Sequence, residues 1–181
     1  MPPLNDPILI NIDDHMLHPF GANEFKRFSS LSHDIYDVLS QEQTTLFLPH
    51  KHLEDVSHAE ILLQTALLNQ HNGMSQMYFI TQKSIQKTIG MIELISPANA
   101  KKHYKLSQYP HIIEFGLSAE HTGKGIMSRL LPKLIKSLHN RGITQLGAVV
   151  DPKNISAIRV LEKSGINKQA YFDHKSNLYY N

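Results

Sequence analysis

The residues Gly123-Lys124-Gly125 lie between an apolar run and a long amphipathic segment. A strand that enters a helix through such a turn aims free backbone N–H groups at an anion, usually a phosphate. Glycine allows the main chain to approach this ligand because no Cβ intervenes. The turn is not a Walker A loop, since Gly125 follows the lysine, and Ser128 replaces the third glycine of a dinucleotide-binding fingerprint. The sequence therefore predicts a short pyrophosphate-binding turn.

Strands and helices alternate around this turn. Apolar residues recur at helical spacing after the turn, and Pro132 within that helix is expected to remove one backbone hydrogen bond and kink it. The predicted elements are a strand over Ile112–Ser118, a helix over Lys124–Arg141, a strand over Leu146–Val150, a helix over Asn154–Ser164, and two closing strands over Ile166–Phe172 and Leu178–Tyr180.

The N-terminal half combines helical periodicity with a pair of β-rich runs. Gly90, inside the second run, is expected at a bulge or a close packing point. The predicted elements are a strand over Ile8–Ile12, helices over Ala22–Leu39 and Leu53–Gln70, an antiparallel hairpin of Met77–Thr81 and Ile85–Ile95, and a polar loop over Pro97–Pro110.

Length and composition exclude several classes of protein. The 181 residues are expected to form one domain, residues 1–181, large enough to bury a conventional core. The absence of cysteine excludes a disulfide scaffold, a thiolate zinc site and a cysteine nucleophile. A formal net charge of +2 is too small to imply a nucleic-acid partner.

Neither a metal site nor a membrane segment is expected. The 12 histidines are scattered without a His-Glu-x-x-His pattern, which favours solvated side chains over ligands. The first apolar run, Ile8–Ile12, is short and precedes two aspartates, unlike a secretory signal. No apolar stretch approaches the length that crosses a bilayer. The expected location is therefore the cytoplasm, with no membrane partner.

Two motifs in this order resemble the GNAT-superfamily N-acetyltransferases. Glu120-His121-Thr122-Gly123-Lys124-Gly125 resembles the family's acyl-CoA motif, Gln/Arg-x-x-Gly-x-Gly/Ala, with Glu120 at its first position. The block that begins at Asn154 and reaches Leu161-Glu162-Lys163-Ser164-Gly165-Ile166 resembles Asn-x-x-Ser/Ala…Leu/Tyr-Glu-Lys-x-Gly-Phe. The closest branch in motif acetylates protein N-terminal amines, including those of ribosomal proteins. The resemblance covers about residues 77–180, and before that only the order of elements agrees.

The resemblance implies an α/β (α+β) fold with a central mixed, mostly antiparallel twisted sheet flanked by helices. It also implies a splay between the fourth and fifth strands, Ile112–Ser118 and Leu146–Val150, where the pantetheine arm of acetyl-CoA adds to a strand edge. Lys124 is equally well explained as a solvated lysine. For Asn154 the alternative is a plain N-cap, and the family match favours the cofactor contact. The implied cofactor-binding residues are Leu117, Ser118, Gly123, Lys124, Gly125, Ile126, Met127 and Asn154.

The implied reaction is direct attack of a primary amine on the thioester in a ternary complex. Glu114 is the candidate general base, with a structural carboxylate or a partner for substrate charge as equal alternatives. It should share a strand face with Gly116 and Ser118. Leu161 occupies a position where many relatives carry a tyrosine that protonates the departing sulfur of coenzyme A. Ser156 is the nearest hydroxyl in the motif that could replace it, although capping or packing in the first helical turn also explains this residue.

Three functions fit these residues. The first is an acetyl-CoA-dependent N-acetyltransferase that acts on a small-molecule or peptide amine and needs no metal. The second is a non-catalytic acyl-CoA sensor, suggested by Leu161 and Glu120, although Glu120 is expected to face solvent. The third is an interaction protein whose turn only ends a strand. Phe47, Tyr104 and Tyr109 are candidates for the acceptor pocket, with ordinary packing as the alternative. The sequence leaves the oligomeric state open, a homodimer included.

Overall fold

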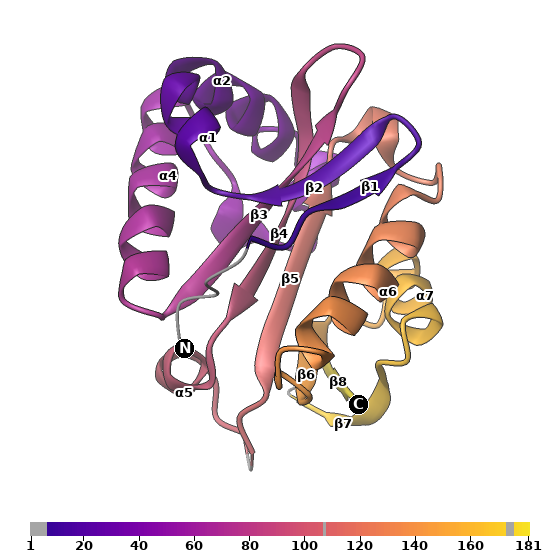
Figure 1. The fold of residues 1–181 in the computed structure, drawn as a ribbon. Helices are drawn as coiled ribbons and strands as arrows, with labels where there is room; N and C mark the ends of the chain where they lie inside the picture. Colours follow the sequence, from indigo (N-terminus) through magenta and orange to yellow (C-terminus); the bar gives the residue numbers. More distant parts are fainter. Residues whose placement is uncertain (1–6, 107, 173–175) are drawn as a thin grey trace.

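The computed structural model describes residues 7–106, 108–172 and 176–181. An eight-stranded sheet in the order β1-β2-β3-β4-β5-β6-β8-β7 runs through its centre (Figure 1). Neighbouring strands are antiparallel except for the parallel pair β5 and β6. The strands are β1 Ile10–Ile12, β2 His15–Pro19, β3 Ser75–Gln82, β4 Lys87–Ile95, β5 His111–Leu117, β6 Leu146–Val150, β7 Asn167–Tyr171 and β8 Asn177–Tyr180. The predicted mostly antiparallel mixed sheet is therefore confirmed.

Helices cover both faces of this sheet (Figure 1). Alternate residues of β3 divide between the two layers: Phe79 packs against α2 and α4, whereas Tyr78 and Ile80 join the core beneath α6. The helices are α1 Ala22–Lys26, α2 Phe28–Leu39, α3 Glu42–Thr45, α4 Val56–His71, α5 Pro97–His103, α6 Ile126–His139 and α7 Ile155–Lys163, with 3₁₀ turns η1 Pro49–Lys51 and η2 Ala119–His121. None of these helices is long and apolar enough to cross a bilayer.

The predicted splay between β5 and β6 is confirmed by the register of these strands. They pair only at His111 with Leu146 and Ile112 with Gly147, within the described residues. On the other side of β5, Ser118 donates its backbone N–H to Ile89. Because hydrogen-bonding direction alternates along an antiparallel strand, the backbone groups of Phe115 and Leu117 face the splay instead. An exposed strand edge is thereby available to a ligand.

Gly90 lies where β4 and β5 approach most closely. A Cβ on Gly90 would stand 2.5 Å from the backbone oxygen of Gly116, too close for any other residue. The register of β3 and β4 shifts beside it, between Ile80 and Thr81. Both expectations for Gly90, a close packing point and an adjacent bulge, are confirmed.

Several elements differ from the sequence-based expectations, among them α3 and η1, which lie where no element was expected. The strand β2 was not predicted; it pairs with β1 through a turn in which Asp13 has a positive φ of 47°. The expected helix over Ala22–Leu39 is broken at Arg27, whose guanidinium reaches Thr88 and the carbonyl of Gln86 on the sheet. The expected loop Pro97–Pro110 contains α5, which Ser96 caps by accepting from the Asn99 N–H.

Candidate functional site

A cavity of about 400 Å³ opens between the glycine turn, the end of β5 and α7. Thr44 and Phe47, from α3 and the residues after it, close its inner end. Most of the predicted cofactor residues and one predicted catalytic residue line it: Leu117, Gly123, Gly125, Ile126, Met127, Asn154 and Ser156. Segments far apart in sequence thus form one concave site of the size that a ligand needs.

The glycine turn has the geometry of an anion-binding site. Gly123 and Gly125 have φ values of 79° and 73°, a region that strongly favours glycine. A Cβ at either position would meet no protein atom within 4 Å, so these glycines border open space. Gly125 is the N-cap of α6 and offers no capping side chain, and the first turn holds no acidic residue. The first N–H groups of this 14-residue helix therefore remain available to a phosphate.

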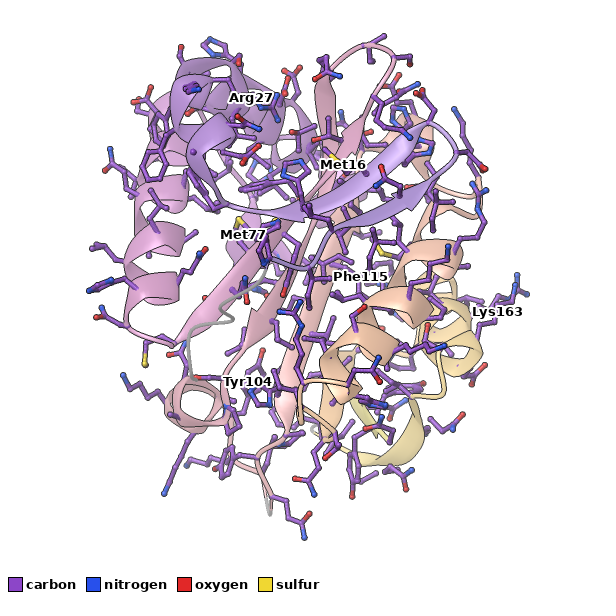
Figure 2. The ribbon with its side chains drawn as sticks, viewed as in Figure 1. Met16, Arg27, Met77, Tyr104, Phe115 and Lys163 are labelled. Atoms are coloured by element: carbon purple, nitrogen blue, oxygen red, sulfur yellow. The ribbon has the colours of Figure 1, made fainter. Side chains whose placement is uncertain are left out.

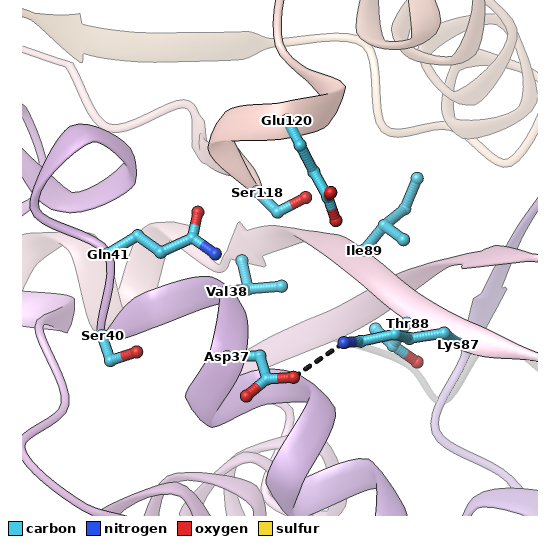
Figure 3. A pocket seen from close by; sticks show the side chains of 9 residues that line it. All are labelled: Asp37, Val38, Ser40, Gln41, Lys87, Thr88, Ile89, Ser118 and Glu120. Atoms are coloured by element: carbon cyan, nitrogen blue, oxygen red, sulfur yellow. Dashed lines mark hydrogen bonds and ion pairs between the residues drawn. The ribbon is translucent and has the colours of Figure 1, made fainter.

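Ser118 and Lys124 lie outside the lining of this cavity. The Ser118 hydroxyl is 2.7 Å from Nδ1 of His121, whose Nε2 is 3.2 Å from Oε1 of Gln82. Ser118 instead borders a separate polar cavity of about 270 Å³ that also includes Asp37 and Glu120 (Figure 3). Its side chain therefore ties the turn to the neighbouring hairpin. Lys124 is exposed.

Asn154 and Glu120 match the expectations for their surroundings. Oδ1 of Asn154 accepts from the Ala157 N–H at 3.1 Å, so Asn154 caps α7 while also lining the cavity. Glu120 is 72% exposed and pairs with His121, as expected for a side chain that faces solvent. Leu161 is fully buried in the core rather than facing the cavity.

Two cationic side chains of the cavity were not singled out from the sequence. Arg159 and Lys163 both line it, and Lys163 projects from α7 at the edge of the molecule (Figure 2). Arg159 and Lys163 lie four residues apart and therefore share one face of α7. Both belong to the sequence block that begins at Asn154, so the helical spacing within that block could have identified them. They bring positive charge to the side of the cavity opposite the glycine turn.

A smaller cavity of about 60 Å³ fills the splay itself. Glu114 lines it together with Phe47, Phe115, Val149 and Asn154. Phe115, Phe47 and Asn154 also line the larger cavity, so the two are contiguous. The candidate base therefore lies at the inner end of the site, beside the open edge of β5. As expected, Glu114 shares a strand face with Gly116, next to which α3 packs.

Glu114 accepts contacts from three side chains that sequence reasoning did not connect with it. Tyr104 donates its hydroxyl to Oε1 at 3.0 Å. Lys51 Nζ lies 3.0 Å and His50 Nε2 3.2 Å from Oε2. Lys51 also donates to Glu93 Oε2 at 2.6 Å, which places one buried ammonium between two carboxylates. Their separations in sequence, up to 64 residues, explain why no local pattern predicted this cluster.

These contacts set the protonation of the cluster. Burial alone would raise the pKa of Glu114, but the hydrogen bond from His50 and the charge of Lys51 lower it to about 2. Burial likewise opposes the charge of Lys51, yet Glu114 and Glu93 raise its pKa above the ordinary value. Burial and the Glu114 carboxylate raise the pKa of Tyr104. Glu114 and Lys51 are therefore charged, and Tyr104 is neutral, near pH 7.

No metal centre accompanies these groups. Within residues 7–106, 108–172 and 176–181, no three histidine, aspartate or glutamate side chains are arranged to hold a metal ion. Lys51 occupies the space between Glu93 and Glu114 and supplies the positive charge there.

Comparison with protein families identifies the architecture. A family model described as an acetyltransferase (GNAT) domain matches residues 25–167, most of the chain. No protein in the curated set matches the sequence.

Solved structures share the fold at low sequence identity. Ribosomal-protein-S5-alanine acetyltransferase from Vibrio fischeri is 14% identical, with a TM-score of 0.67 and 96% of each chain covered. An acetyltransferase from Salmonella typhimurium that modifies the N-terminal serine of protein L7/L12 is 16% identical, with a TM-score of 0.68 and coverage of 94% of this chain and 95% of that chain. RimL, a ribosomal L7/L12 alpha-N-protein acetyltransferase solved in complex with coenzyme A, is 18% identical, with a TM-score of 0.69 and coverage of 96% of this chain and 97% of that chain.

Proposed function

Because the chain belongs to the GNAT acetyltransferase family, we propose that it transfers the acetyl group of acetyl-CoA to a primary amine. The observation that carries this proposal is the continuous cavity from the glycine turn to the splay. It offers backbone N–H groups for a diphosphate at one end and an open strand edge at the other. Glu114 lies beside that edge.

The residues fit an acyl-CoA in two places. The first turn of α6, from Gly125 to Met127, would hold the pyrophosphate, with Arg159 and Lys163 adding positive charge from across the cavity. The backbone groups of Phe115 and Leu117 would bind the pantetheine arm as an added strand. Thr44 already donates its hydroxyl to the Leu117 carbonyl at 3.0 Å, which leaves the Leu117 N–H and the groups of Phe115 for this purpose.

The reaction would proceed by direct attack. The amine nitrogen forms a bond to the thioester carbonyl carbon and loses a proton, the C–S bond breaks, and coenzyme A leaves as a thiolate that takes up a proton. Positioning of the two substrates in one cavity supplies much of the rate, because it makes the encounter effectively intramolecular. Leu161 offers no acidic group here, and Ser156, an exposed residue of the cavity wall, remains a candidate proton donor.

We propose a peptide α-amine as the acceptor. Two of the similar structures are of a ribosomal L7/L12 alpha-N-protein acetyltransferase and of an enzyme that modifies the N-terminal serine of L7/L12. The acceptor would reach the thioester from the side of Phe47 and His50, where the exposed Leu46 offers an apolar contact for a first side chain. An ammonium group approaching from this side meets the permanent negative charge of Glu114.

A panel of acceptors tests the proposal. Thiol release from acetyl-CoA would be measured with peptides of varied N-terminal residue, free lysine, polyamines and aminoglycosides. The protein contains no cysteine, so a thiol-trapping reagent has no protein background. We expect release that depends on an added amine and is fastest with peptide N-termini. Tight calorimetric binding of acetyl-CoA without turnover on any amine would instead select a sensor function.

A further inference from the structure

The carboxylate of Glu114 is poorly suited to remove a proton from an amine. Its pKa of about 2 lies far below that of an α-ammonium group, about 8. A proton transfer from such an ammonium to Glu114 is therefore strongly unfavourable. The same hydrogen bonds that keep Glu114 ionised occupy both of its oxygens. Another group must take the proton.

His50 is the side chain that connects this carboxylate to solvent. It lies on η1 and its ring is 56% exposed, whereas the Glu114 side chain is only 10% exposed. The contact joins Nε2 to Oε2 of Glu114 at 3.2 Å. Because an ionised carboxylate can only accept, Nε2 carries the hydrogen of this contact. In the neutral ring Nδ1 is then the basic nitrogen, and no described residue forms a hydrogen bond with it.

The elements around His50 are arranged to keep this tautomer. Lys51, the next residue of η1, and Tyr104, after α5, fix the two oxygens of Glu114. Glu93 of β4 lies behind Lys51 and balances its charge. A proton taken up by His50 would be stabilised by the adjacent carboxylate, as in catalytic His–Asp pairs. Glu114 lines the splay, so the ring that contacts its carboxylate at 3.2 Å is one residue removed from that cavity.

We propose that His50 is the general base of the acetyl transfer and that Glu114 acts as its positioning residue. This inference rests on the proposed function. As the N–C bond forms, Nδ1 accepts the proton that the amine nitrogen loses. The electron pair of the breaking C–S bond leaves with sulfur, and the thiolate takes a proton from solvent. The exposed His50 ring returns its proton to solvent, so that the enzyme regains its starting state.

The test compares His50→Gln with the full-length wild-type protein. A general base contributes about 100-fold or more, so kcat/KM should fall by roughly that factor near neutral pH while acetyl-CoA affinity stays unchanged. The pH profile of kcat/KM should also differ between the wild type and this variant, because the variant lacks the proton-accepting side chain. His33→Gln, on the exposed face of α2, is the matched control and should behave as wild type.

Two further variants separate catalysis from structure. Added imidazole should restore part of the rate to His50→Ala, a rescue that a merely structural role would not give. Glu114→Gln should also lower the rate, and its effect should not add to that of His50→Ala, since the two act as a unit. If the wild type is active and His50→Gln retains a rate within about threefold of it, or keeps the same pH profile, the role of His50 is overturned and the proposed function stands. Absence of wild-type turnover overturns the proposed function itself.

Discussion

The ammonium of Lys51 lies 3.0 Å from the carboxylate of Glu114, and both groups are buried. A second carboxylate, that of Glu93, lies 2.6 Å from the same nitrogen. Two buried carboxylates this close to each other are tolerated only because a cation stands between them. The inner end of the site therefore depends on a residue that itself lies outside the cavity lining.

Replacement of this cation tests that dependence. Lys51→Met should lower the free energy of unfolding by about 3–5 kcal/mol at pH 7, because it removes the cation between the buried carboxylates of Glu93 and Glu114. Lys87→Met is the control: it removes an ion pair with Asp37 whose side chains are 40% and 50% exposed, and should cost less than about 1 kcal/mol. Urea denaturation measures both, and equal losses in the two variants would contradict the account.

The ionisation of Glu114 predicts a pH dependence of stability. A carboxyl group whose pKa falls from 4.5 when unfolded to about 2 when folded stabilises the protein above the higher value and loses this contribution as pH falls through that range. This contribution is about 3 kcal/mol. The difference in unfolding free energy between wild type and Glu114→Gln should therefore shrink on acidification from pH 5. A difference that stays constant to pH 3 would show that Glu114 is not held ionised.

The glycine turn permits a matched pair of substitutions. Gly125→Ala and Gly142→Ala both place a Cβ on a residue with positive φ, 73° and 81°, in open space. Each should lose roughly 1 kcal/mol of stability through backbone strain. Only Gly125→Ala should also weaken coenzyme A binding in calorimetry, because its Cβ enters the space proposed for the pyrophosphate. If Gly125→Ala and Gly142→Ala bound coenzyme A with equal affinity, the phosphates would have to bind elsewhere.

The basic residues of α7 predict a salt-dependent contribution to affinity. Arg159→Ala should weaken coenzyme A binding about tenfold at low ionic strength, because a charge-assisted hydrogen bond to phosphate is lost. Lys133→Ala, on the exposed side of α6, is the control with no expected effect. The loss should diminish as salt is added. An affinity independent of Arg159 would show that this wall of the cavity does not face a phosphate.

Local sequence patterns predicted the half of the site that is built from contiguous motifs. The turn from Gly123 to Gly125 and the cap at Asn154 each combine a residue type with a position in a strand–helix unit, so spacing identifies them. The sequence Ser96-Pro97 is a local pattern of the same kind, because a capping residue before proline is typical of a helix start, and α5 begins there.

The other half of the site depends on contacts between distant segments. His50 and Lys51 belong to a short 3₁₀ turn, and they meet Glu114 only because η1 packs over the face of β5. The break between α1 and α2 has a similar origin, since Arg27 is drawn to Thr88 on the sheet. Such interactions leave no periodicity in the sequence, because tertiary contacts rather than local propensity select the conformation.

The central claim is that an acetyl group moves from coenzyme A to an amine at this site. Its most direct test is mass spectrometry of an acceptor peptide after incubation with acetyl-CoA that carries a deuterated acetyl group. The account predicts one deuterated acetyl group on the peptide α-amine, in step with the thiol released. Thiol release without any labelled peptide, or no release with any amine, would contradict it.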